Sequence, residues 1–173
     1  MGSAVFVFLL MFFSVILQVF AGSYGFFVPC AAYATFYVAV TYGWRCGGMA
    51  AIAQGVCVDA IYMRSWFFSV AALLLITGLA QLWLVRADGK SLWAKVLPGL
   101  LIAVVCTLGP VGGNIVSGGG TPDEFLHELM SWLFTLMLSG GLLPLLIFLA
   151  DDVAEHLGLQ GFERAREKYI HRR

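Results

Sequence analysis

GGMAAIAQGVCVDAIYMR, residues Gly47–Arg64, is the stretch on which the interpretation of the whole chain depends. It is apolar enough for a membrane helix, yet it carries one carboxylate, Asp59, near its end. On a helix, Gly48, Ala51 and Gly55 recur at i, i+3 and i+7 and share a face, which Asp59 joins at i+11. Small residues on one face of a membrane helix let another backbone approach closely. An acid on that face has to point into protein or a water-filled cavity, so the sequence predicts a closely packed helix with a buried acid.

The composition outside this stretch is that of an integral membrane protein. The chain has 173 residues, of which 61% are hydrophobic and 12% charged. That charged share is about half of what soluble globular domains carry. The formal net charge is zero, so no basic field favours nucleic acid as a partner. We expect one membrane domain, residues 1–150, followed by a cytoplasmic amphipathic tail, residues 151–173. The N-terminal segment lacks the positive region of a signal peptide, and we expect it to be a retained helix.

Six apolar segments predict an all-α fold, a bundle of six transmembrane helices. The third has 16 residues and would be about 24 Å long, slightly short for a hydrocarbon core of about 30 Å. Pro144, close after Gly140-Gly141, predicts a kink in the last segment. The segments are Ser3–Phe20, Phe26–Tyr42, Gly47–Tyr62, Trp66–Val85, Leu92–Gly112 and Asp123–Ala150.

The distribution of lysine and arginine predicts the orientation of this bundle. Cytoplasmic loops of membrane proteins carry an excess of these residues. With six spans and both termini inside, nine of them fall on the cytoplasmic side and one, Arg64, on the outer side. The sequence therefore predicts an even number of spans with the N- and C-termini inside. The nine are Arg45, Arg86, Lys90, Lys95, Arg164, Arg166, Lys168, Arg172 and Arg173.

Asp59 is the one acid that lies well inside a predicted span, and three interpretations of it remain open. It makes a polar contact that locks helix packing or assembly, it lies harmlessly at the outer interface because the helix is short, or it serves a ligand or a proton. Arg64 follows five residues later and would pair with it loosely along the helix. Replacement of Asp59 by Asn distinguishes the three, since only packing predicts lost assembly with normal expression.

The start of the last segment carries a strong helix signal and a cluster of polar residues. Thr121–Glu124 supplies an N-cap, a proline at the first helical position and a capping-box glutamate. Glu124, His127 and Glu128 share a face at i, i+3 and i+4, which suits a metal ion. A solvated first turn explains them better, because acids favour the helix N-terminus and no further ligand lies nearby.

The residues after Ala150 predict a polar, amphipathic tail. Phe162, Ala165 and Tyr169 fall at i, i+3 and i+7 among charged residues. Such a helix lies on the inner headgroups or docks a cytoplasmic partner, and the first interpretation is favoured. The Asp151-Asp152 pair stands at a helix C-terminus, against the dipole preference, and this indicates a basic partner.

Catalytic signatures are absent from the sequence. No G-x-S-x-G, H-E-x-x-H, P-loop or dinucleotide fingerprint occurs, and no two acids converge inside a span. We expect no enzymatic activity, no cofactor and no metal. The cysteines show no C-x-x-C spacing, and each is expected to pack as a small apolar residue; they are Cys30, Cys46, Cys57 and Cys106.

The order of these features resembles the bacterial rod shape-determining protein MreD family. The resemblance rests on a second helix that begins with Pro29, a third with Gly55-x-x-x-Asp59, and a last helix that contains Pro144 before a short charged tail. Ala51 departs from the pattern, since family members often have glycine there. A glycine-rich turn soon after the acid, common in the family, is also missing.

This resemblance implies a fold like the S subunits of energy-coupling-factor vitamin transporters and a multi-pass location in the bacterial inner membrane. It also implies a non-enzymatic scaffold that pairs with MreC and joins the MreB cytoskeleton to the glycosyltransferases and transpeptidases of peptidoglycan elongation. Gly48, Ala51, Gly55 and Asp59 would form its helix-packing or partner interface. The alternative is an S-type substrate-binding subunit with an outer cavity, for which Trp66, Asn114, His127 and Trp132 are candidates, although tryptophan also forms interfacial belts.

Overall fold

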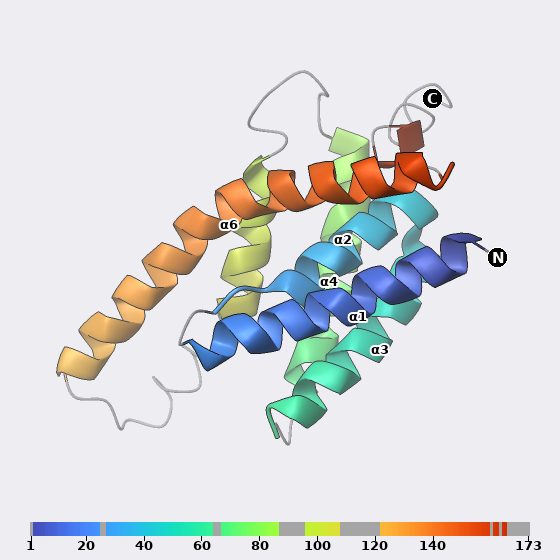
Figure 1. Ribbon diagram of the computed structural model, residues 1–173. Coiled ribbons are helices and arrows are strands. Elements are labelled where there is room, and N and C mark those ends of the chain that lie inside the picture. The colour runs from blue at the N-terminus through green and yellow to red at the C-terminus, as the bar shows by residue number, and fades with distance from the viewer. Residues whose placement is uncertain are drawn as a thin grey trace.

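The structure is a computed structural model that describes residues 2–24, 27–63, 67–86, 96–107, 122–159, 161–162 and 164–165. The described residues form helices and no strand, as the sequence predicts (Figure 1). Three helical segments are long and apolar enough to span a membrane: Gly2–Ser23, Phe68–Val85 and Leu133–His156. The helices are α1 (Gly2–Ser23), α2 (Cys30–Tyr42), α3 (Trp44–Ile61), α4 (Phe68–Arg86), the apolar helix Val96–Thr107 and α6 (Pro122–His156).

Proline and glycine set the ends of these helices. Pro29 precedes α2, where its missing N–H is harmless. Gly43 alone separates α2 from α3, and its φ of +91° lies in the region that favours glycine. α6 begins at Pro122, the predicted start, and continues through Pro144. Figure 1 shows that α6 changes direction part-way along its length, consistent with the kink that a proline inside a helix predicts.

Consecutive helices of the first half run in opposite directions. Gly47, at the start of α3, lies against Ala39, near the end of α2. Asp59, near the end of α3, contacts Ser69, at the start of α4. The starts of α2 and α4 therefore lie at the same end of the bundle as the end of α3.

α2 is the centre of the bundle, and 12 of its 13 residues are buried. It packs against α1, α3, α4 and α6. The Tyr33 hydroxyl donates to Ser139 Oγ of α6 over 2.5 Å. The Gln81 side-chain amide of α4 donates to the backbone carbonyl of Ala39 over 3.1 Å. Because α2 is surrounded by protein, several of the hydroxyls that it carries find partners on neighbouring helices, among them those of Thr35 and Tyr37.

The segment after α6 folds back onto the bundle. Gly158 adopts a φ of +67°, and the Leu159 N–H donates to the Ala154 carbonyl over 2.8 Å, which closes the end of the helix. Phe162 is 5% exposed, with its ring 6.0 Å from that of Tyr37 and 5.6 Å from that of Trp83. Both interpretations of the tail placed the apolar side of Phe162 against headgroups or a partner. The structure corrects this for the described part, because the core of the same chain covers that side.

Asp151 fixes this reversal of the chain. One carboxylate oxygen, Oδ1, accepts the Tyr37 hydroxyl at 2.8 Å and the Phe162 N–H at 2.6 Å. The Asp151-Asp152 pair was interpreted from the sequence as a sign of a basic partner. In the structure Asp151 accepts hydrogen bonds from the protein's own groups, while Asp152 is exposed. α6 also runs without interruption past Ala150, the predicted end of the membrane domain.

Candidate functional site

The predicted small-residue face of α3 lies inside the bundle. A Cβ on Gly55 would come within 2.6 Å of the Val70 Cα in α4, closer than real Cβ atoms approach. A Cβ on Gly47 would come within 2.6 Å of the Ala39 Cβ in α2. Ala51, between these two glycines, is fully buried. α3 therefore meets α2 and α4 through backbone contact, the arrangement that small residues permit in membrane helices.

Gly48 does not take part in these contacts. It is half-buried, and a Cβ placed on it would meet nothing within 4 Å. The packed face contains Gly47, Ala51 and Gly55, at i, i+4 and i+8. The predicted face was Gly48, Ala51 and Gly55, at i, i+3 and i+7. The structure thus brings together Ala51, Gly55 and Asp59 of the four predicted residues and leaves Gly48 beside open space.

Asp59 binds the start of the neighbouring helix. Asp59 is only 3% exposed. The Ser69 backbone N–H donates to both of its carboxylate oxygens, which lie 3.3 and 3.2 Å from the nitrogen. Ser69 is the second residue of α4. The first N–H groups of a helix have no partner within the helix, and the partial positive charge there favours an anion. Asp59 thus serves as a cap that α3 supplies to α4.

Gln18 of α1 plays the same part for α2. Its Oε1 accepts the Ala31 N–H over 3.0 Å, and the residue is 6% exposed. Ala31 is the second residue of α2, as Ser69 is of α4. Two buried side chains from neighbouring helices therefore satisfy the starts of two helices at one end of the bundle.

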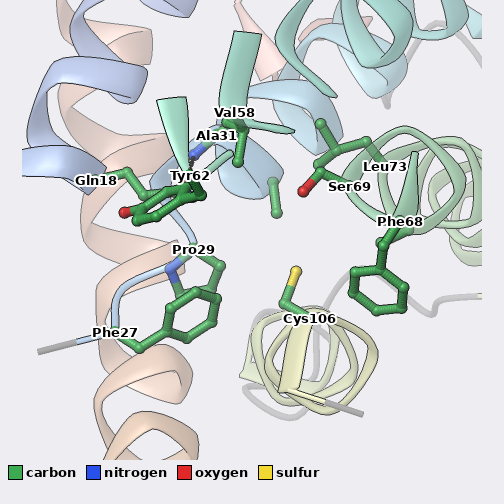
Figure 2. A pocket seen from close by; sticks show the side chains of 12 residues that line it. Gln18, Phe27, Pro29, Ala31, Val58, Tyr62, Phe68, Ser69, Leu73 and Cys106 are labelled. Atoms are coloured by element: carbon green, nitrogen blue, oxygen red, sulfur yellow. Dashed lines mark hydrogen bonds between the residues drawn. The ribbon is translucent and has the colours of Figure 1, made fainter. Parts of the chain in front are cut away.

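A small cavity lies between these two capped starts. Its volume is about 30 Å³, which is room for about one water molecule. Figure 2 shows Gln18 and Tyr62 on one side of this space, with the Ser69 hydroxyl and the Cys106 sulfur directed toward it. The described residues thus enclose a space far smaller than the pockets of about 300–1,000 Å³ that hold small-molecule ligands.

A buried polar cluster crosses the middle of α1, α2 and α3. Gln54 is 2% exposed; its Nε2 donates to Ser14 Oγ over 2.7 Å and to the Met11 carbonyl over 3.2 Å. Its Oε1 accepts the Thr35 hydroxyl over 2.6 Å. Neither this cluster nor the role of Gln18 was predicted from the sequence, in which Gln54 stood out only as an amide near the membrane. The signal that would have found them is a lone polar residue inside an apolar segment, because such residues turn toward protein in a membrane.

The candidates for an outer cavity fall where the structure gives no side chains. Trp66 and Asn114 lie outside the described residues, as do the side chains of His127 and Trp132 in α6. The side chains of the candidate metal cluster, Glu124, His127 and Glu128, are likewise outside the described part of the chain. Among the side chains that are described, no three His, Cys, Asp or Glu residues converge as metal ligands.

The chemistry of the described site is that of helix attachment. The hydrogen bonds described for Asp59 come from a backbone amide, that of Ser69 at the start of α4. An acid in this position holds two helices together and does not face a substrate-sized space. No family model, curated protein or solved structure matches the chain.

Proposed function

We propose that the protein is a non-enzymatic scaffold subunit of the bacterial inner membrane, similar to MreD, which pairs with an MreC-like membrane protein in the machinery of cell shape and peptidoglycan elongation. The proposal is supported by the order of features along the chain, which resembles that of the MreD family at Pro29, Gly55, Asp59 and Pro144. The helical bundle with three membrane-length helices is compatible with it.

We propose six spans with both termini in the cytoplasm. The shorter apolar helices Cys30–Tyr42 and Val96–Thr107, together with α3 (Trp44–Ile61), would then cross the membrane beside the three helices of membrane-spanning length. The alternating directions of α2, α3 and α4 suit this topology, as does the nine-to-one distribution of lysine and arginine. In this orientation the Asp59–Ser69 contact lies at the outer end, and Asp151 and Phe162 lie at the inner end.

The observation that carries the choice of a scaffold is the contact between the Asp59 carboxylate and the start of α4. An S-type subunit holds a vitamin at the outer end of the bundle, whereas the cavity next to the Asp59–Ser69 contact has a volume of about 30 Å³. Asp59 itself is occupied by Ser69 and is not directed at a ligand-sized space. Both facts favour a protein whose buried acid is structural over one that captures a small molecule.

The partner surface of this scaffold lies outside the packed face of α3. Gly55 and Ala51 are covered by the protein's own helices. Gly48 has open space where a Cβ would project, and the neighbouring Met49 is 67% exposed. We propose that an MreC-like helix approaches α3 on the side of Gly48 and Met49.

Purification in a gentle detergent, followed by identification of the proteins and small molecules recovered, tests the proposal. A membrane protein of the cell-wall machinery is expected with the wild type and should be reduced with Gly48→Leu. Gly78→Leu in α4 is the matched control, because Gly78 also has open space around its Cβ position and leaves α3 untouched. Recovery of a vitamin together with a transporter ATPase, and of no cell-wall protein, would contradict the scaffold.

A further inference from the structure

The residues described after α6 contact three other helices at the end of the bundle where α6 ends (Figure 1). We call residues 158–159, 161–162 and 164–165 the strap. Leu159 reaches the start of α1, since a Cβ placed on Gly2 would lie 3.7 Å from its Cδ2 atom. The Phe162 ring lies among three others at centroid distances of 6.3, 6.0 and 5.6 Å. These rings, which we call the socket, are Phe36 and Tyr37 of α2 and Trp83 of α4.

One carboxylate oxygen attaches the strap to the central helix. Asp151 Oδ1 accepts the Phe162 N–H at 2.6 Å and the Tyr37 hydroxyl at 2.8 Å. The strap backbone approaches this oxygen closely because residue 161 is glycine; a Cβ on Gly161 would lie only 3.1 Å from it. A movement of the strap therefore changes the surroundings of Tyr37 twice, since the ring loses its neighbour and the hydroxyl no longer shares its acceptor.

The strap has few buried contacts compared with the helix that it covers. Among its described side chains Phe162 and Ala165 are buried, whereas 12 of the 13 residues of α2 are. Its ion pair, between Arg164 and Glu155, is exposed at both partners, and such pairs contribute little to stability. Segments with few buried apolar contacts open locally at a much lower free energy than the whole fold. We therefore expect the strap to open about Gly158, where the chain turns, while the bundle stays folded.

The charge of the chain beyond the strap favours a second position for it. Basic residues beside a membrane are attracted to anionic headgroups, and the strap follows directly on a helix of membrane-spanning length. The face of the strap that carries Phe162 and Ala165 suits the surface of a bilayer as well as a protein core. Socket and anionic membrane surface thus compete for one face. Eight residues follow the strap, and four of them are basic: Arg166, Lys168, Arg172 and Arg173.

We propose that the strap is a conformational switch controlled by anionic lipid. In the structure Phe162 occupies the socket. An anionic membrane surface attracts the basic residues that follow and draws the strap out of the socket. The three rings are then uncovered, and Asp151 keeps the Tyr37 hydroxyl but loses the Phe162 amide. The switch requires a membrane but no MreC-like partner, so it does not depend on the proposed scaffold function.

Fluorine NMR of the full chain in lipid nanodiscs measures the two positions. 4-Fluorophenylalanine incorporated at position 162 should give one resonance shifted by the rings of the socket and a second resonance after release. In discs of phosphatidylcholine the socket resonance should dominate. Addition of phosphatidylglycerol should raise the ratio of released to socket signal at least about tenfold, the effect of little more than one basic residue at an anionic surface. A single unchanged resonance in both kinds of disc would overturn the proposal, because Phe162 would then be a permanent part of the core.

A charge variant tests whether the basic residues carry this response. Arg172→Gln combined with Arg173→Gln removes half of the basic residues beyond the strap, and the response to phosphatidylglycerol should fall from about tenfold to about threefold. Arg45→Gln is the control, because Arg45 is an exposed basic residue at the start of α3 and lies outside the strap. Equal responses in the two variants would contradict control by anionic lipid.

A second pair of variants tests the attachment at Asp151. Asp151→Ala removes the acceptor of the Phe162 N–H and should raise the released fraction about tenfold in phosphatidylcholine alone. Asp152→Ala removes the same charge from the exposed neighbour and should leave the released fraction unchanged. Equal fractions in both variants would overturn the role of the latch. Circular dichroism of the same samples checks the bundle, and a loss of helix that accompanies release would mean that the strap opens only by unfolding, which also overturns the proposal.

Discussion

α3 meets its neighbours in two different ways on its two sides. Toward α4 the contact is between backbones, with Gly55 against Val70 and a buried carboxylate on the Ser69 amide. Toward α1 the helices meet at Gln54 and elsewhere stand apart around a groove of about 790 Å³. One helix thus carries a close backbone contact on one side and a wide groove on the other.

This difference shows how a membrane protein distributes its stability. Lipid chains are as apolar as leucine, so burial of apolar surface does little to drive helices together within the bilayer. Close contact and hydrogen bonds have to supply the attraction. On the α4 side both are present, and on the α1 side large side chains keep the helices apart and lipid can take the place of protein. Substitutions of the same kind should therefore have opposite outcomes on the two sides.

Gly55→Leu should have the largest effect, because it attacks the backbone contact. Its Cβ would lie 2.6 Å from the Val70 Cα, and a backbone atom has no rotamer with which to move aside. Overpacking of a well-filled core costs about 1–3 kcal/mol and occasionally more, and we expect the upper end, about 3 kcal/mol or a loss of folded protein. Thermal unfolding in detergent measures it. Gly48→Leu is the control and should keep the wild-type melting temperature, since its Cβ meets open space; equal losses in both variants would contradict the comparison.

Asp59→Leu should have the next largest effect, and Asp59→Asn should be tolerated. Leucine leaves the Ser69 N–H without its acceptor, whereas asparagine keeps one oxygen for that bond. Loss of a helix cap costs about 0.5–2 kcal/mol, and asparagine caps about as well as aspartate. Denaturant titration of the three proteins should give wild type and Asp59→Asn together and Asp59→Leu about 1–2 kcal/mol below them. If Asp59→Asn keeps its stability but abolishes growth support, Asp59 has a role in proton or ligand chemistry.

The sequence predicted that α3 has a closely packed face of small residues, but it did not predict all the residues of that face. Proline marked the start of α2 at Pro29, whereas the third segment was predicted to begin at Gly47 and α3 begins at Trp44, directly after Gly43. The sequence pattern placed Gly48 on this face, whereas the structure places Gly47 there, and the difference has a physical reason. A period of 3.6 lies between 3 and 4, so both glycines are compatible with a face through Ala51. Ala39 on another helix decides between them, and that contact is not local in sequence.

The reversal of the chain after α6 was beyond prediction for a similar reason. Phe162 falls on an amphipathic pattern that serves equally for a lipid surface and for a protein core. Its location depends on Gly158, which turns the chain, and on Asp151, which accepts both Tyr37 and the Phe162 amide. The contact between Tyr37 and Asp151 joins segments more than a hundred residues apart, and periodicity carries no information about it.

Gln54→Leu should have a moderate effect, since Gln54 makes the hydrogen-bonded contact on the α1 side of α3 and also bonds to α2. Its partners keep alternatives: the Thr35 hydroxyl also donates to the Ala31 carbonyl, and the Ser14 hydroxyl donates to the Met11 carbonyl. Hydrogen bonds between membrane helices contribute about 0.6 kcal/mol on average, so we expect a total loss of about 1 kcal/mol. A double-mutant cycle with Thr35→Val should give a coupling of about 0.6 kcal/mol. A loss of several kcal/mol would mean that the α1 side is as tightly held as the α4 side.

Ala53→Leu should have the smallest effect, because it adds the same side chain as Gly55→Leu on the open side of the same helix. Ala53 is exposed and lines the groove, so the added atoms replace lipid and push against no backbone. Alanine and leucine have nearly equal helix propensity, and substitutions at such positions usually stay within about 0.5 kcal/mol. The two leucine variants, unfolded side by side in the same detergent, measure the asymmetry of α3 directly. A gap of at least about 2 kcal/mol between them is expected from the range for overpacking. Equal melting temperatures would mean that the groove closes in the membrane and that α1 packs on α3 as closely as α4 does.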